Sequence, residues 1–271
     1  MVKLHYVEQG QGRPLVLVHG WSQSTRSFAK QLAGLSTRYR VIAVDLRGHG
    51  ESPKPKHGYR VARLAQDLHD FLVRLDLHEV AIAGHSMGAA VIWSYVEQFG
   101  RARLEKLIFI DQAPLVTNGR GLSGDALADA GCAFTPTTLY DIAQAIATDR
   151  PATLQGLRSA FFSAAVSDED FALAVNESLK IPAEYAARLL IDHASQDWRD
   201  VISQVIPTLN LPTLVFGGEL ASIFPPQAAA WIAAQIPGAQ LSIFSREEGG
   251  SHFMFWENPQ KFNAVMAQFL G

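Results

Sequence analysis

The sequence has little of what marks secreted or membrane-spanning proteins. Its 271 residues include one cysteine, Cys132, so no internal disulfide can form and the fold does not depend on an oxidising compartment. No run of about 18 apolar residues is present, and we therefore expect no membrane-spanning helix. The N-terminus lacks the apolar core of a signal peptide, so the expected location is the cytoplasm.

An excess of one charge is also missing, because the formal net charge is only −3. This balance gives no electrostatic reason to expect nucleic acid or an anionic membrane as a partner. Neither a His-Glu-x-x-His motif nor a pair of cysteines occurs, so we expect no metal site. The composition leaves the oligomeric state open.

Short apolar runs alternate with helix-like segments over the first part of the chain and again near its end. The runs read as strands at residues 4–7, 15–18, 41–44, 80–83, 107–110, 213–216 and 241–244. Such alternation predicts a parallel sheet with helices on both faces. The intervening segment is instead alanine-rich, with helical periods and no obvious strand. We therefore predict an α/β core of residues 1–115 and 206–271, with a helical cap of residues 116–205 inserted over the carboxyl edge of its sheet.

The most informative feature is the pentapeptide Gly84-His85-Ser86-Met87-Gly88, which lies between a strand-like run and a helix-like stretch. Two glycines at this spacing permit a turn so tight that side chains at their positions would collide. The turn presents a serine hydroxyl to a pocket, and the N–H groups of the following helix face whatever that hydroxyl attacks. The pattern predicts Ser86 as a nucleophile rather than as part of an ordinary glycine-rich turn.

A serine nucleophile needs a base that a third group holds in the right tautomer. Of the nine histidines, His252 alone lies in a loop between the last strand and the last helix, and we predict it as the general base. We expect His85 to point away from the pocket, and His19 and His49 to bond to local backbone. Four others read as ordinary surface or helix residues: His57, His69, His78 and His193.

Four motifs together resemble those of the α/β-hydrolase superfamily, and the resemblance covers almost the whole chain. They are His-Gly-Trp at 19–21, Asp-Leu-Arg-Gly-His-Gly-Glu-Ser at 45–52, the pentapeptide at 84–88, and Gly-Ser-His-Phe at 250–253. Within the superfamily the chain is most similar to small esterases, enol-lactonases and cofactor-free haloperoxidases. The resemblance implies a mostly parallel eight-stranded sheet with a helical cap, and no cofactor. It also implies an oxyanion hole formed by the backbone N–H groups of Trp21 and Met87.

The position of the third, acidic group stays open between two candidates. Superfamily members usually carry this acid after the penultimate strand, but here the stretch 216–226 has no carboxylate in register, and Glu219 misses by at least one residue. Some members place the acid after the strand that follows the nucleophile helix, where this chain has Asp111. A carboxylate directly after four apolar residues is costly to bury without a partner, and a histidine N–H supplies one. We favour Asp111, with Glu219 or another acid as the alternative.

These residues predict a serine hydrolase that cleaves a small-molecule carboxylic ester or lactone through an acyl-enzyme, with Ser86, His252 and Asp111 as its triad. One alternative is redox chemistry on the same fold, either perhydrolysis of the haloperoxidase type or cofactor-free cleavage of a heteroaromatic ring. Another is a ligand receptor without turnover. The alanine-rich cap favours a roomy apolar cavity, but the sequence does not identify the substrate.

Overall fold

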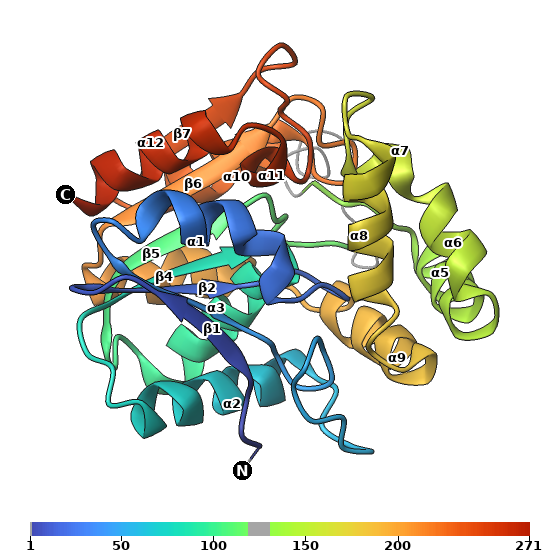
Figure 1. Cartoon of the computed structure of the whole chain (residues 1–271), viewed down its shortest axis with the longest axis horizontal. Helices are drawn as coiled ribbons and strands as arrows, with labels where there is room; N and C mark the ends of the chain where they lie inside the picture. The colour runs from blue at the N-terminus through green and yellow to red at the C-terminus, as the bar shows by residue number, and fades with distance from the viewer. Residues whose placement is uncertain (1, 119–130) are drawn as a thin grey trace.

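The computed structural model describes residues 2–118 and 131–271. Within them seven strands form one sheet in the order β1-β3-β2-β4-β5-β6-β7. The first strand pairs with β3 in the antiparallel sense, and every other pair is parallel (Figure 1). The strands are β1 (Tyr6–Gln9), β2 (Pro14–Val18), β3 (Arg40–Val44), β4 (Val80–His85), β5 (Leu104–Ile110), β6 (Thr213–Gly218) and β7 (Gln240–Phe244).

This mostly parallel sheet confirms the predicted fold class, with one correction to its size. The resemblance implied eight strands, whereas the described residues form seven. The reason is that each of the seven strand-like runs in the sequence forms one strand, and the described residues contain no eighth run of this kind. The first strand is also shifted from the expected 4–7 to Tyr6–Gln9, where it pairs with residues 41–44 of β3.

Helices cover both faces of the sheet, and the strand residues alternate between the two resulting layers. On one face lie α1 (Ala29–Leu35), which follows the short turn η1 (Thr25–Phe28), together with α11 (Met254–Glu257) and α12 (Pro259–Leu270). On the other lie α2 (Val61–Arg74), α3 (Met87–Phe99) and α10 (Pro226–Gln235). Along β2, Leu15 and Leu17 pack in the first layer and Val16 and Val18 in the second. Strands buried on both sides explain why their runs are continuously apolar.

Between β5 and β6 the described chain forms helices joined by loops, with isolated bridges at Leu115 and Thr117. We call α5 to α9 the cap helices: α5 (Pro136–Thr148), α6 (Arg150–Gly156), α7 (Arg158–Phe161), α8 (Asp168–Ser178) and α9 (Ala183–Ala194). A π-helical turn, η2 (Val201–Val205), and a 3₁₀ turn, η3 (Ile206–Leu209), lead back to the sheet. Figure 1 shows the cap helices (yellow-green to gold) gathered at one end of the sheet.

The division of the chain into a core and a cap at residues 116 and 205 stays a prediction, and residues 119–130 of that cap lie outside the described residues. None of the described helices is both long enough and apolar enough to cross a lipid bilayer.

The two glycines that flank Ser86 are required by close contacts between backbone segments. A Cβ atom on Gly84 would lie 2.4 Å from the carbonyl oxygen of Gly88. A Cβ atom on Gly88 would lie 2.3 Å from the carbonyl oxygen of Val18, at the end of β2. The first turn of α3 therefore packs against the ends of β2 and β4 with no room for a side chain, which fixes the position of the serine.

Replacing Gly88 with alanine tests this packing. We expect Gly88→Ala to lower the free energy of unfolding by about 1–3 kcal/mol, because the backbone of β2 or α3 must move to accept the methyl group. Gly156→Ala is the matched control, because Gly156 is helical and its Cβ would meet no heavy atom within 4 Å. That variant should be neutral or stabilised by about 0.4–1 kcal/mol in urea unfolding. Equal stability of the two variants would contradict the close approach.

Candidate active site

Ser86 occupies the sharp turn between β4 and α3 that its sequence predicts. Its backbone has φ 52° and ψ −127°, a conformation that costs a non-glycine residue on the order of 1–3 kcal/mol. The Ser86 N–H donates to the carbonyl oxygen of Ile110 at 2.8 Å, which ties the turn to the end of β5. Ser86 lines a cavity of about 230 Å³. The strained turn thus holds the serine at the cavity wall.

Asp111 and His252 come together although 141 positions separate them in the chain. The Nδ1 of His252 lies 2.5 Å from Oδ2 of Asp111, and both residues are buried. Asp111 has φ 48°, and its N–H donates to the carbonyl oxygen of Phe216 at 3.0 Å. The backbone N–H of Gly218 also donates to the Asp111 carboxylate. The carboxylate is therefore held between the ends of β5 and β6 and directed at the imidazole.

Glu219, the alternative acid, has a different set of contacts. It follows β6 on the exposed surface, and its Oε2 accepts a hydrogen bond from the Arg246 N–H at 3.2 Å. The next residue, Leu220, donates its N–H to the carbonyl oxygen of Gly250 at 2.8 Å. Of the two candidates, the structure brings Asp111 to His252, whereas Glu219 bonds to Arg246 on the loop after β7.

The expectation that His85 points away from the pocket is wrong, because His85 is among the residues that line the cavity. Its Nε2–H donates to the carbonyl oxygen of His252 at 2.9 Å, and the two imidazole centroids are 4.5 Å apart. Phe161 from the cap helices and Phe224 each place a ring centroid 5.6 Å from that of His252. The predicted base is thus enclosed by rings, and His85 holds its backbone in place.

This enclosure acts on the ionisation of both partners. Burial lowers the pKa of His252 and raises the pKa of Asp111, because each charged form loses solvation in the apolar surroundings. A lone charge on either residue is therefore unfavourable. When the imidazole takes up a proton, its new positive charge is stabilised by the adjacent carboxylate in a medium of low dielectric constant. The pair is suited to accept a proton during a reaction and to release it afterwards.

The two predicted oxyanion donors, the backbone N–H groups of Trp21 and Met87, lie beside the serine. Met87 is the first residue of α3, where a helical N–H has no acceptor within the helix. A Cβ atom on Gly20 would lie 3.1 Å from the Cβ of Ser86, so the peptide leading to Trp21 adjoins the serine. Within residues 2–118 and 131–271, neither N–H has a protein acceptor. Both are free to bind a ligand oxygen, and their role stays a prediction.

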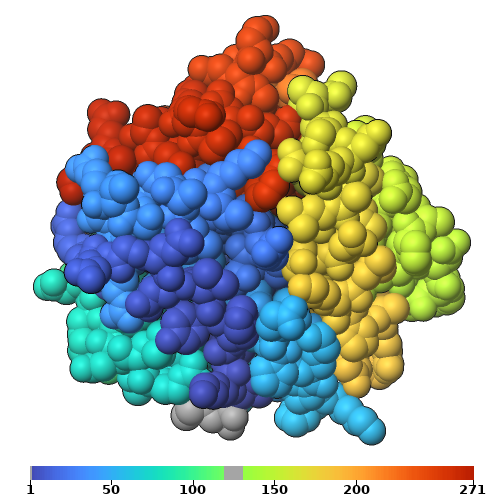
Figure 2. All heavy atoms as spheres, viewed as in Figure 1, coloured from blue at the N-terminus to red at the C-terminus, as the bar shows by residue number. Residues whose placement is uncertain are grey.

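The cap helices hold the loop that carries Trp21. The indole Nε1–H of Trp21 donates to the carbonyl oxygen of Ala186 in α9 at 2.9 Å. The guanidinium of Arg150 in α6 donates to the hydroxyl of the next residue, Ser22. On the face shown in Figure 2, atoms of α8 and α9 (yellow to gold) lie directly against N-terminal atoms (blue). The loop after β2 is therefore fixed from the side of the cap as well as from the sheet.

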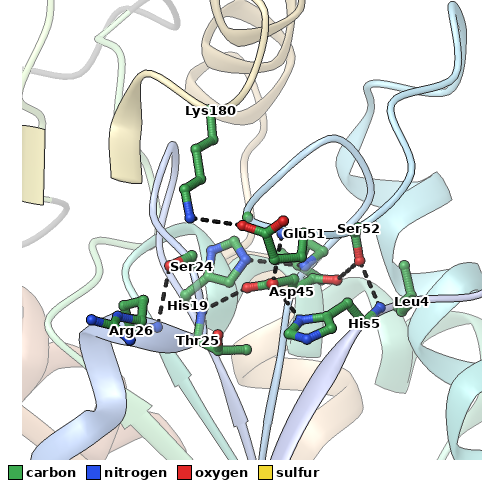
Figure 3. A network of polar contacts seen from close by, with 12 residues as sticks. Leu4, His5, His19, Ser24, Thr25, Arg26, Asp45, Glu51, Ser52 and Lys180 are labelled. Atoms are coloured by element: carbon green, nitrogen blue, oxygen red, sulfur yellow. Dashed lines mark hydrogen bonds and ion pairs between the residues drawn. The ribbon is translucent and has the colours of Figure 1, made fainter. Parts of the chain in front are cut away.

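Asp45 explains the motif at 45–52, because its buried carboxylate joins the loops that follow β2 and β3. It accepts hydrogen bonds from the N–H of Thr25 at 2.7 Å and from the N–H of Glu51 at 2.9 Å. The ring of His5 contacts the same carboxylate at 2.8 Å, and Lys180 of the cap reaches Glu51 at 2.8 Å (Figure 3). The motif therefore supports the site without touching the cavity.

Three more histidine predictions can be compared with the structure. Nδ1 of His19 donates to the Gly20 carbonyl oxygen at 2.8 Å, and Nδ1 of His49 donates to the Arg47 carbonyl oxygen at 2.9 Å. Both confirm the predicted local backbone bonds. His193 does lie in a helix, α9, but it is buried and faces the cavity rather than solvent. The sequence analysis missed it as a residue of the site.

The cavity measures about 230 Å³ and lies between the cap helices and the carboxyl edge of the sheet. Ser86 and His252 form part of its wall, and most other lining residues are apolar, among them Phe134, Ile142, Leu154, Phe162 and Val175. For comparison, an engineered cavity of about 150 Å³ holds benzene. The space therefore suits an apolar group somewhat larger than one ring. The described residues include no group of three or more side chains placed to hold a metal ion.

The comparisons with known proteins agree with this geometry. A family model described as alpha/beta hydrolase fold matches residues 13–259. The chain belongs to the α/β-hydrolase family. A putative non-heme chloroperoxidase of Synechocystis is 30% identical over 99% of this chain and 95% of its own length.

Two solved structures extend this likeness. A bromoperoxidase from Bacillus anthracis has a TM-score of 0.89 at 27% identity, covering 99% of this chain and 95% of that one. An esterase from Exiguobacterium antarcticum has a TM-score of 0.88 at 26% identity, covering 99% and 96%. This α/β hydrolase is thus similar both to esterases and to proteins named as haloperoxidases.

The buried histidines make the stability of this α/β hydrolase depend on pH. Burial lowers the pKa of His19, His49, His85, His193 and His252, which titrate near 6.5 when unfolded. Below that pH the unfolded chain binds more protons than the folded chain does. The stabilisation of the fold by the neutral histidines is therefore present above about pH 6.5 and is lost as the pH falls. For His193, with a pKa of about 3, the loss continues down to that value.

Urea unfolding between pH 8 and pH 4.5 measures this loss, and His193→Phe provides the control. Below about pH 6 the free energy of unfolding of the variant should fall less steeply, by about 1.4 kcal/mol per pH unit for the missing proton. The same slope in both proteins would show that His193 is not held neutral in the folded state.

Proposed function

We propose that the chain hydrolyses a carboxylic ester or lactone, with Ser86 as nucleophile, His252 as general base and Asp111 as the acid of the triad. The contact between His252 Nδ1 and Asp111 Oδ2, at 2.5 Å, is the observation that carries this proposal. With Nδ1–H donated to the carboxylate, Nε2 is the nitrogen free to accept a proton. Ser86 and His252 line one cavity, which supplies the space for an acyl group.

In the first half of the reaction, His252 takes the proton of the Ser86 hydroxyl while Oγ attacks the substrate carbonyl carbon. The N–H groups of Met87 and Trp21 bind the resulting oxyanion, and each such donor is worth about 100- to 1,000-fold in rate. The tetrahedral intermediate then collapses, the bond to the leaving oxygen breaks, and His252 passes its proton to that oxygen. The alcohol departs and the acyl group stays on Ser86.

In the second half, His252 removes a proton from water, whose oxygen attacks the acyl carbon. The same oxyanion donors act again, and collapse releases the acid and returns the proton to Ser86. Throughout, Asp111 keeps Nδ1 protonated and stabilises the imidazolium when it forms. For a lactone, the alcohol released in the first half stays attached to the acyl group until the acyl-enzyme is hydrolysed.

The names of the chloroperoxidase and bromoperoxidase relatives support a second candidate at the same site. If hydrogen peroxide replaces water in the second half, its attack on the acyl-enzyme gives a peracid and free Ser86. The peracid then oxidises a halide outside the protein. This route uses the same first half, so it does not change the proposed residue roles.

Loss of the nucleophile tests the acyl-enzyme route. Ser86→Ala should lower kcat for short p-nitrophenyl esters by at least about 10³-fold, because no acyl-enzyme can form. A fluorophosphonate probe should label Ser86 of the unmodified protein, as read by peptide mass spectrometry. Ser222→Ala, which removes another serine of the cavity wall, should still be labelled at residue 86. Unchanged ester turnover in Ser86→Ala would rule out the mechanism, and peracid formation with added peroxide identifies the second candidate.

The identity of the acid is tested separately by two amide substitutions. Asp111→Asn should lower kcat by roughly 10⁴-fold with the fold intact, because the amide favours the wrong histidine tautomer. Glu219→Gln should retain most activity, since Glu219 bonds to Arg246 instead of the imidazole. Steady-state kinetics on one ester, with circular dichroism as the check on folding, compares the two. A larger effect of Glu219→Gln would reverse the assignment.

A further inference from the structure

His193 differs from the other buried histidines in having no hydrogen-bond partner. It lies in the last turn of α9, is 4% exposed, and lines the cavity that also contains Ser86. Its Nδ1 is buried and unpaired, and no residue in the described part of the chain bonds to its Nε2. The other four buried histidines each use at least one ring nitrogen in a hydrogen bond: His19, His49, His85 and His252.

Because this unpaired imidazole lines the cavity, a molecule bound there can supply the hydrogen bond that buried polar groups nearly always make. Burial alone lowers the pKa of His193 to about 3, and no charged neighbour contributes. The ring is therefore neutral at ordinary pH, with one N–H donor and one acceptor nitrogen. A neutral ring of this kind suits an uncharged oxygen better than a carboxylate or an ammonium group.

None of the described residues in the surrounding wall bonds to the ring. Leu190, one turn earlier on the same face of α9, also lines the cavity, as do Ile142 and Leu154 of the neighbouring cap helices. A purely apolar ligand that filled the cavity would displace water and leave the imidazole unpaired. Such a ligand would bind less tightly than one of the same shape that carries an oxygen at this point.

Helix α9 also fixes where His193 stands relative to the reacting serine. Ala186, two turns before His193, accepts the hydrogen bond of the Trp21 indole at 2.9 Å. Trp21 belongs to the loop that adjoins Ser86. The imidazole is thus held at a constant place with respect to the site of reaction, as a recognition residue must be.

We propose that His193 recognises the substrate, by hydrogen-bonding a ketone or hydroxyl oxygen on the part of the ester or lactone that enters the cavity. The inference rests on the proposed esterase or lactonase function and narrows its substrate class. Oxo- or hydroxyacyl esters and lactones are preferred over their unsubstituted counterparts. His193 takes no part in proton transfer and acts through binding.

The test compares p-nitrophenyl esters of hexanoate, 4-oxohexanoate, 5-oxohexanoate and 5-hydroxyhexanoate. The unmodified protein should prefer at least one oxygenated ester over hexanoate in kcat/KM. In His193→Phe that preference should fall by about 10- to 100-fold, mainly through KM, since the lost bond is one of binding. His193→Gln, which keeps a donor and an acceptor, should restore part of it. No preference in the unmodified protein, or the same preference in His193→Phe, overturns the proposal.

Leu190→Met is the matched control, because it changes the shape of the same wall and not its polarity. It should change kcat/KM for hexanoate and the oxygenated esters by the same factor. A loss of the preference in this variant equal to that in His193→Phe would assign the effect to cavity shape and overturn the proposal.

Binding without turnover separates this inference from the proposed reaction. Octan-2-one and octane-2,7-dione cannot be hydrolysed, and calorimetry gives their Kd values in the unmodified protein and in His193→Phe. The dione should bind at least about 10-fold more tightly than the monoketone only when His193 is present. That result together with absent ester turnover would refute the esterase and keep the recognition site. Equal Kd ratios in both proteins would refute the recognition site.

Discussion

The hydrogen bond between His252 Nδ1 and Asp111 Oδ2 is the contact on which the rest of the site depends. It joins the end of β5 to the loop after β7, 141 positions further along the chain, and it does so where both side chains are buried. Burial makes an isolated charge on either residue costly, so the charged form of each group is stabilised only beside the other. The contact also decides which imidazole nitrogen faces the cavity. In the proposed mechanism, the buried Ser86 depends on this contact, because it sets the imidazole nitrogen that takes the serine proton.

Both the sheet and the cap helices contribute residues around this contact. The sheet supplies Ser86 and Asp111 at the ends of neighbouring strands, each with a positive φ that a non-glycine residue adopts only under constraint. The cap helices supply Phe161 against the His252 ring and hold the loop of Trp21 through α9. The same helices also form part of the cavity wall, so we expect changes in them to alter both the shape of the cavity and the position of the Trp21 loop.

The fold, and the residues that meet at the candidate site, were predictable because local rules fix them. The spacing of Gly84 and Gly88 indicates a turn too tight for side chains, and apolar runs followed by turns indicate where the strands lie along the chain. In the stretch 216–226, where superfamily members usually carry the acid, this chain has Ala221 and Ser222 at the expected positions and therefore no carboxylate. This absence is why the sequence favours Asp111. His193 and Phe161 were not found, because their roles depend on how the cap helices pack. One signal was available for His193: it shares a face of α9 with Leu190, Ala186 and Ala194, which are all buried. A polar residue on an apolar helix face is informative only when that face meets a cavity and not the core, and the sequence does not distinguish the two.

The placement of the acid on β5 is consistent with how the last loops pack. A Cβ atom on Gly218 would lie 2.0 Å from the carbonyl oxygen of Gly250, so the end of β6 and the loop of His252 run backbone against backbone. The Leu220 N–H continues this contact by donating to the same carbonyl. Such close packing leaves little room for a carboxylate from the β6 loop to turn toward the imidazole. Asp111 instead reaches the ring from the neighbouring strand, and the Gly218 N–H binds its carboxylate. The end of β6 thus supports the residue that we propose as the acid instead of supplying it.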